Sequence, residues 1–209
     1  MCPPARVSSD SCRCHPEEKK FGSENDYLSE TGRQFVAGLI EHAMPMTVFA
    51  APTVNGYKRF RPYSFAPDRV TWALENRGAL IRAQGAPGDA NSHVEQRMGE
   101  PAANPYLYMA ANIAAGLDGI RRKLPAPPPV EADPYAAAAP MLPTSLADAV
   151  AALEKDTFFR EAFGDTLIDY LLQMKRAELA RHDAAVAESP PPDGQDVTDW
   201  EMREYFEFY

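Results

Sequence analysis

The sequence has few cysteines, no long apolar run and no block of basic residues. Its three cysteines, at positions 2, 12 and 14, lie near the N-terminus, so disulfides cannot cross-link the body of the chain. No stretch approaches the roughly 20 apolar residues that a membrane-spanning helix needs. Acidic residues number 30 and basic residues 21, and no Lys/Arg block could neutralise a nucleic-acid backbone. We therefore expect no membrane or nucleic-acid partner and, because a secretory signal is absent, a cytoplasmic location.

The common short motifs of nucleotide and metal sites are also missing. The sequence contains no GxGxxG after a strand, no phosphate loop ending in GK[ST] and no HExxH. Cys12, Cys14 and His15 could in principle bind a metal, but no second ligand pair of standard spacing follows. We interpret them as incidental exposed thiols beside a histidine. His42 and His93 are isolated, which favours hydrogen-bonded structural histidines over catalytic bases.

The composition and patterning predict one α+β domain after a short leader. With 45% hydrophobic residues the chain can form a sizeable core. Residues 1–20 are polar and rich in Pro, Ser and Cys, so we predict a disordered leader there and one domain over 21–209. Helical periodicity and capping residues predict helices over 30–44, 105–124, 145–155 and 157–184. The segment 125–143, with seven prolines, is expected to be extended, and the aromatic tail 197–209 to dock on the body or on a neighbour.

A different pattern, of short β-prone runs, occupies the region between residues 46 and 98. Turn-forming clusters separate these runs, which predicts the strands of one antiparallel sheet flanked by the helices. The predicted strands lie at 47–51, 69–74, 79–83 and 93–98.

Charged residues stand among apolar neighbours in this region. They are Arg59, Arg77, Arg82, Glu95 and Arg97. Glu95 and Arg97 are two residues apart in a predicted strand, so both project from one face. One interpretation is an internal salt bridge between strands. The other is a substrate site, because the four arginines outnumber the single glutamate and leave an excess of positive charge. A guanidinium group can donate two hydrogen bonds to one carboxylate or phosphate.

An ordered string of motifs resembles the glutamine synthetase family. The motifs are ETGRQFVAGLIEHA, APTVNGYKRF, ENRGALIR, VEQR and NPYLYMAANIAAGLDGI, and the resemblance extends from about Phe21 to Tyr209. It implies a catalytic domain with a barrel-like sheet and flanking helices. It also implies an enzyme that makes γ-glutamyl phosphate from ATP and glutamate, after which ammonia or another amine displaces the phosphate.

The resemblance implies roles for five residues. Arg59 and Arg97 match positions that bind the glutamate carboxylates, and Glu95 matches a metal ligand. Arg77 and Arg82 match positions that hold the ATP phosphates, with Arg77 as the catalytic residue that stabilises the phosphoryl group in transfer. Mg²⁺ or Mn²⁺ is implied, and a single carboxylate such as Glu95 cannot hold it alone.

Two positions depart from the family pattern. His93 stands where members usually have a further arginine, which predicts weaker phosphate binding there. Phe65 stands where ammonia-using members have a glutamate that helps take a proton from ammonium. An aromatic side chain offers an apolar face, so we expect an alkylamine or polyamine rather than ammonium.

The other departure is length. Family subunits are about twice as long, and the N-terminal β-grasp domain and the remaining metal ligands of the family precede the region present here. The expectation is a truncated glutamate–amine ligase that, alone, has little activity and associates irregularly, whereas the full-length family forms homo-oligomeric rings. The alternatives are a non-catalytic assembly or regulatory subunit of the same family and an unrelated acidic binding module.

Overall fold

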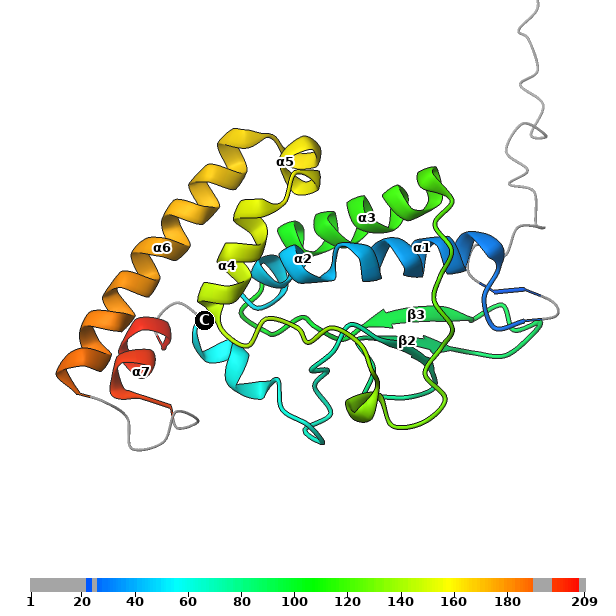
Figure 1. Ribbon diagram of the computed structural model, residues 1–209, viewed down its shortest axis with the longest axis horizontal. Helices are drawn as coiled ribbons and strands as arrows, with labels where there is room; N and C mark the ends of the chain where they lie inside the picture. Colours follow the sequence, from blue (N-terminus) through cyan, green and yellow to red (C-terminus); the bar gives the residue numbers. More distant parts are fainter. Residues whose placement is uncertain (1–21, 24–25, 190–196, 207–209) are drawn as a thin grey trace, which may run out of the picture.

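The computed structural model describes residues 22–23, 26–189 and 197–206. The predicted leader 1–20, its three cysteines and the last three residues of the aromatic tail lie outside the described residues. Helices α1, α2 and α3 lie over one side of a small sheet, and helices α4 to α7 form a second group beside them (Figure 1). The expected α+β class is confirmed.

Helices α1 (Glu30–Glu41) and α3 (Pro105–Arg122) form a closely packed pair, as their periodicity predicts. The Ser29 hydroxyl caps α1 by accepting from the Gly32 N–H, and the Asn104 side chain caps α3. The pair packs at glycines, because a Cβ on Gly38 would overlap the main chain of α3 at Ala115. Two helix backbones can therefore touch here.

The predicted strand 47–51 is wrong, because most of this segment belongs to helix α2 (Ala43–Ala50). The helix continues almost directly from α1 after His42 and packs against α4. Seven of its eight residues are buried. A short helix that is apolar on every side carries no amphipathic period, so periodicity cannot distinguish it from a buried strand.

The sheet has three strands in the order β1–β2–β3, namely β1 (Trp72–Leu74), β2 (Ile81–Gln84) and β3 (His93–Gln96). Strands β2 and β3 are antiparallel, as predicted, but β1 and β2 are parallel. The connection 75–80 is therefore not the hairpin turn that the ENRG cluster suggests. Instead the chain returns to the start of β1, where the Ile81 N–H donates to the Thr71 carbonyl at 3.1 Å.

The proline-rich segment 125–143 is extended, as expected, and runs along the outside of β1. The Val130 N–H donates to the Trp72 carbonyl, and the Trp72 indole N–H donates to the Pro127 carbonyl at 2.7 Å. Its only helical part is the short 3₁₀ turn η2 (Pro134–Ala136). This segment thereby supplies the backbone partners that a further strand would otherwise provide.

Four helices complete the C-terminal part: α4 (Leu146–Lys155), α5 (Phe158–Phe163), α6 (Asp165–Glu188) and α7 (Asp199–Tyr205). Of the two candidate caps at the start of α4, Thr144 and Ser145, it is Ser145 whose hydroxyl accepts from the Asp148 N–H. The single helix predicted over 157–184 is divided at Gly164, whose φ of 84° lies in the left-handed region. The apolar residues at helical spacing in 157–184 predict a buried stripe, and Phe159 is fully buried, but Tyr170 is exposed. No helix within the described ranges is long and apolar enough to cross a membrane.

The aromatic tail docks on the body of the chain, which is one of the two predicted outcomes. The Tyr205 hydroxyl accepts from the Val54 N–H at 2.9 Å and donates to the buried carboxylate of Glu178 at 2.5 Å. The buried Glu201 carboxylate pairs with Lys58 at 2.6 Å, in the 3₁₀ turn η1 (Asn55–Arg59). Helix α7 therefore holds η1 and α6 together.

Candidate functional site

A cavity of about 350 Å³ lies on one face of strands β2 and β3 and collects four of the five predicted charged residues. Arg82 comes from β2, Glu95 from β3, Arg97 from just after β3, and Arg77 from the connection between β1 and β2. Phe65, from the loop before β1, lines the same cavity. The cavity thus has three guanidinium groups and one carboxylate on its walls.

Glu95 lies between two of these arginines. Its Oε1 contacts Arg97 Nη1 at 2.7 Å, and its Oε2 is 3.5 Å from Arg82 Nη1. Arg82 and Glu95 are direct neighbours in the β2–β3 register, and Arg97 follows on the same face of β3. The internal ion pairs of the first interpretation are present, and positive charge remains in excess, whereas the substrate site stays a prediction.

The positive charge that these ion pairs do not neutralise belongs to Arg77. Its side chain is exposed, and within the described residues it makes no ion pair. Its backbone carbonyl accepts from Arg97 Nε at 2.9 Å, so the position of the Arg77 main chain is fixed although its side chain is not.

Glu75 is a site residue that the sequence analysis missed. Its carboxylate contacts Arg82 Nη2 at 2.6 Å and accepts from the Gly85 N–H at 3.0 Å. The Gly85 N–H and the Arg82 guanidinium hold the pKa of the Glu75 carboxyl below its usual value. Glu75 has a φ of 51°, and this left-handed backbone conformation orients its side chain toward β2. The sequence does not reveal this conformation.

Arg97 joins three separate segments of the site. Besides Glu95 and the Arg77 carbonyl, it donates from Nη2 to the Phe65 carbonyl at 2.8 Å. The Arg97 side chain is only 15% exposed, although its carbonyl partners on Arg77 and Phe65 lie at the surface. Through Arg97 the sheet positions the loop that carries Phe65.

Arg59 does not line this cavity, although sequence reasoning grouped it with the other four residues. Its guanidinium donates to the carbonyl of Met98, next to Arg97, and lies 4.8 Å from the centroid of the Phe60 ring. Burial lowers the pKa of the Arg59 guanidinium, and the charge of Arg97 adds to the effect. Arg59 therefore lies behind the cavity wall.

Glu100 is a second residue that the sequence analysis missed. It accepts from the Thr53 hydroxyl at 2.9 Å, and burial raises the pKa of its carboxyl although Thr53 and Arg59 act in the opposite direction. The sequence places Glu100 just past the VEQR motif, but only the folded chain brings it to Thr53 and Gly56.

An aromatic cavity of about 220 Å³ adjoins the arginine cavity and shares Phe65 and Arg77 with it. Tyr63 and Tyr135 form part of its wall, with ring centroids 5.1 Å apart. The Tyr63 hydroxyl donates to Asp133 at 3.0 Å, from the proline-rich segment. Sequence reasoning singled out Phe65 and Arg77 but missed Tyr63, Asp133 and Tyr135, and the last two come from a segment about 70 positions away in the chain.

Neither isolated histidine belongs to the arginine cavity. His42 contacts Asp118 at 2.7 Å and stacks on Phe158, which agrees with the predicted structural role. His93 contacts the Gln84 side chain at 2.9 Å and the Asn91 carbonyl at 2.7 Å. His93 shares a strand face with Glu95 but does not line the cavity.

The described residues offer few metal ligands. Nowhere in these ranges do three or more His, Cys, Asp or Glu side chains lie together as a metal site requires. The arginine cavity has only the Glu95 carboxylate, which already contacts two guanidinium groups. Its residues fit an anion with several oxygens and supply at most one ligand to a divalent cation.

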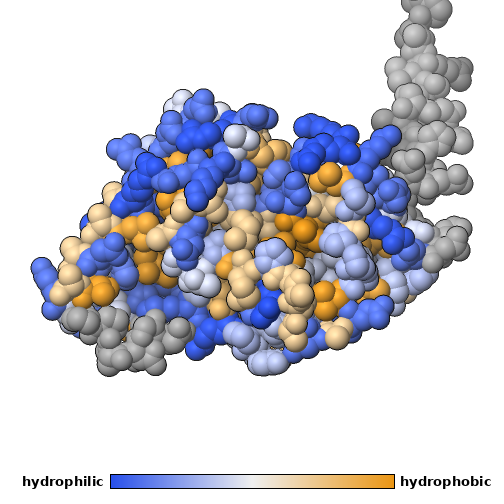
Figure 2. All heavy atoms as spheres, viewed as in Figure 1, coloured by the Kyte–Doolittle hydropathy of each residue, from blue (hydrophilic) through white to orange (hydrophobic). Residues whose placement is uncertain are grey.

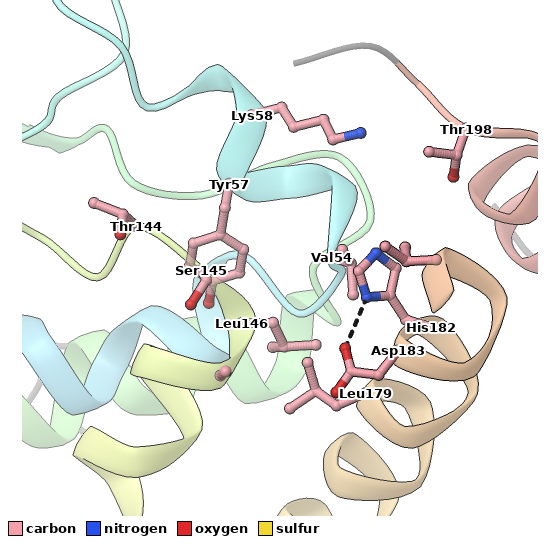
Figure 3. A pocket seen from close by; sticks show the side chains of 12 residues that line it. Val54, Tyr57, Lys58, Thr144, Ser145, Leu146, Leu179, His182, Asp183 and Thr198 are labelled. Atoms are coloured by element: carbon pink, nitrogen blue, oxygen red, sulfur yellow. Dashed lines mark hydrogen bonds and ion pairs between the residues drawn. The ribbon is translucent and has the colours of Figure 1, made fainter. Parts of the chain in front are cut away.

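A third cavity, of about 330 Å³, lies apart from the arginines, between η1, α4, α6 and α7 (Figure 3). Its walls are mainly apolar, and Tyr57, Lys58 and His182 project toward it in Figure 3. The Tyr57 hydroxyl is buried without a hydrogen-bond partner in the described part of the chain. This cavity contains no predicted site residue.

The chain matches one protein-family model over residues 14–205, that of the glutamine synthetase catalytic domain. A γ-glutamylanilide synthase from Acinetobacter is 50% identical over 88% of this chain, and a glutamine synthetase from Thermus thermophilus is 41% identical over 72% of it. A solved structure of ligand-free GmaS covers 90% of the chain with a TM-score of 0.70 at 34% identity.

These matches cover only part of each relative. The chain spans 37% of the Acinetobacter protein, 35% of the Thermus protein and 41% of the GmaS chain. The matched part includes the sheet, the arginine cavity and the helices that cover them. The chain therefore belongs to the glutamine synthetase family, whose catalytic-domain model it matches over residues 14–205.

Proposed function

We propose that this chain forms the anion-binding wall of an enzyme that joins an amine to the γ-carboxylate of glutamate with the use of ATP. The observation that carries the proposal is the cavity in which Arg77, Arg82 and Arg97 surround a single carboxylate, Glu95. Glutamate, ATP and a γ-glutamyl phosphate all present several negative oxygens, which guanidinium groups bind bidentately. Family membership supports the same activity.

The three cavity arginines take different parts in this proposal. Arg97 is shielded and fixed by three contacts, so it suits the carboxylates of glutamate, which must be held still for reaction. Arg82 faces the ATP phosphates from β2. Arg77 is exposed and free of ion pairs in the described chain, so its side chain can follow the phosphoryl group and stabilise its charge during transfer.

Arg59 has an indirect part. Because its guanidinium contacts the Met98 carbonyl, it acts on glutamate by holding the segment that carries Arg97. Glu95 is the one carboxylate in the cavity that can reach a divalent ion. Mg²⁺ or Mn²⁺, when bound, neutralises charge on the phosphate oxygens.

Phe65 supports an amine larger than ammonia as the acceptor. It lines both cavities, and its ring cannot take a proton from ammonium as a carboxylate can. Two relatives have names that specify such amines, the γ-glutamylanilide synthase and a γ-glutamylethanolamide synthetase from Streptomyces coelicolor, which is 34% identical.

A non-catalytic family subunit is the second candidate, and one observation favours it. With Glu95 as the only carboxylate among the described residues that line the arginine cavity, the described part of the chain supplies too few ligands for a catalytic metal ion. Such a subunit would retain the fold and its surfaces without turnover.

Glutamate-dependent phosphate release from ATP separates the two candidates. The purified chain is assayed with Mg²⁺ or Mn²⁺ and with ammonia, methylamine, ethanolamine, a polyamine and aniline. If the chain is the enzyme, Arg77→Ala lowers the rate of phosphate release by about 100-fold, which is the usual effect of losing one contact to the transition state. Glu95→Ala abolishes turnover. Arg121→Ala, an exposed arginine outside the cavities, leaves the rate unchanged. Absence of phosphate release with every amine is the result expected of a partial chain that has little activity alone. It contradicts the proposed anion-binding wall when Arg77→Ala and Arg97→Ala also leave the binding of ATP and glutamate by the chain unchanged.

A further inference from the structure

The loop before β1 holds two bulky aromatic residues in an unfavourable backbone conformation. Tyr63 has a φ of 61° and Phe65 a φ of 59°, in the left-handed region that side chains of this size rarely adopt. Such a conformation is unfavourable for a residue with a Cβ and persists only where surrounding contacts fix it. Both rings are nevertheless about 70% exposed, so burial in the core does not explain the conformation.

Contacts from two sides hold this loop in place. Arg97 donates to the Phe65 carbonyl at 2.8 Å, from the arginine cavity. On the other side Asp133 accepts from the Tyr63 hydroxyl at 3.0 Å, and the Tyr135 hydroxyl donates to the Ala66 carbonyl at 3.0 Å. The proline-rich segment and the sheet thus fix the two rings in the strained conformation while leaving their faces open.

The result is an open aromatic cavity beside the anion site. The rings of Tyr63, Phe65 and Tyr135 line it, and Phe65 and Arg77 are shared with the arginine cavity. A ligand ring placed here makes aromatic contacts, and a substituent on that ring can reach the neighbouring cavity. The volume of about 220 Å³ suits a single aromatic ring.

The charges around the cavity favour a neutral ligand. Asp133 supplies a carboxylate to the lining of the cavity. One of its oxygens accepts a hydrogen bond from the Tyr63 hydroxyl, and the other accepts from the Tyr135 N–H. Arg77 lines the same cavity and repels an ammonium group. An aryl amine is neutral near pH 7 because its nitrogen lone pair is delocalised into the ring, so it needs no base to remove a proton before it reacts.

We infer that this aromatic cavity binds the ring of a neutral aryl amine, with Tyr63, Phe65 and Tyr135 as its walls and Asp133 as the residue that positions Tyr63. The inference rests on the proposed amine-ligase function, whose acceptor it specifies. It assigns to the proline-rich segment a part in selecting the amine.

Binding of aniline to the purified chain tests the inference in the absence of ATP and glutamate. Saturation-transfer difference NMR at pH 7.5 compares aniline with benzylamine, which has the same ring but a protonated amine. We expect aniline to bind more tightly than benzylamine. Tyr63→Ala should weaken aniline binding by about tenfold, the loss of one aromatic contact, and Tyr63→Phe by less, since it removes only the hydrogen bond to Asp133.

Tyr170→Ala is the matched control, because Tyr170 is a similarly exposed tyrosine on α6 that lines neither cavity. Three results would each overturn the inference. They are equal aniline binding by the Tyr63→Ala variant and the unaltered chain, binding of benzylamine as tight as that of aniline, and no aniline binding at all. Aniline binding that depends on Tyr63, without any phosphate release, supports the cavity and counts against the ligase. Turnover of aniline that is insensitive to Tyr63→Ala supports the ligase and overturns the cavity.

Discussion

The arginines of the site differ in how far their partners neutralise them. Arg82 contacts both Glu75 and Glu95, and Arg97 contacts Glu95 and two carbonyls, whereas the Arg77 side chain makes no ion pair within the described chain. A guanidinium that is already paired is pre-positioned, and one that is free can exchange water for substrate oxygens. The proposed division between positioning and phosphoryl stabilisation follows from these contacts.

Glu75 predicts a pH dependence of stability at the residue scale. The lowered pKa means that the folded state favours the carboxylate, so this contribution is present above the ordinary glutamate pKa of about 4.3 and is lost as pH falls through the lowered value. In Glu75→Gln the contribution is absent at every pH. We expect the thermal unfolding midpoints of the two proteins to differ at pH 7 and to converge as the pH falls below about 4.

Thermal unfolding followed by circular dichroism between pH 3 and pH 7 measures this difference. Glu161→Gln, an exposed glutamate on α5, serves as the control and should follow the unaltered protein at each pH. A gap between Glu75→Gln and the unaltered protein that stays constant down to pH 3 would contradict the assigned contacts.

At the scale of elements, the α1–α3 contact depends on two glycines. A Cβ on Gly38 would overlap the Ala115 carbonyl, and a Cβ on Gly119 would overlap the Gln34 carbonyl. The atoms that would clash belong to the main chain and cannot rotate away. Because α1 and α3 cover the sheet, their separation affects the whole core beneath them.

Gly38→Ala should therefore destabilise the protein even though alanine is the better helix former. We expect a loss of about 1–3 kcal/mol in the free energy of unfolding, the cost of overpacking a close contact. Urea denaturation measures it, with Thr31→Ala on the exposed side of the same helix as the control. A Gly38→Ala variant as stable as Thr31→Ala would show that the two helices can separate at little cost.

The whole molecule leaves an apolar stripe on the outer side of α3. Its large side chains recur at helical spacing and are exposed, namely Tyr106, Met109, Ile113 and Leu117. On the face seen in Figure 2, hydrophobic residues are interspersed with hydrophilic ones. A helix face of this kind is typical of a surface that contacts another protein chain.

We expect this stripe to cause self-association of the chain. Ile113→Glu places a charge in the stripe and should weaken association by about tenfold or more. Sedimentation velocity over a range of concentrations measures the change. Ala184→Glu adds the same charge at an exposed site on α6 and should leave association unaltered. A stable monomer at all concentrations in the unaltered protein would refute the expectation.

Elements that local chemistry specifies can be deduced from the order of the residues alone. Ser29 and Asn104 cap the helices they were expected to cap, Ser145 is one of the two candidate caps of α4, and seven prolines keep 125–143 extended. Strand alternation also placed Glu95 and Arg97 on one face, whereas only the folded sheet set the register that brings Arg82 beside them. The caps, the extended segment and the shared face depend on neighbouring residues or on a fixed period, so they can be deduced before the fold is known.

Only the tertiary structure decided which distant segments meet. Helix α2 is apolar all round, so its pattern does not separate a helix from a strand, and the parallel pairing of β1 with β2 depends on the path of the connection. Arg59 lies behind the cavity wall, and Glu75 enters the site through a left-handed backbone conformation. The aromatic cavity joins Tyr63 to Asp133 across about 70 residues, because packing of the proline-rich segment, and not sequence spacing, brings them together.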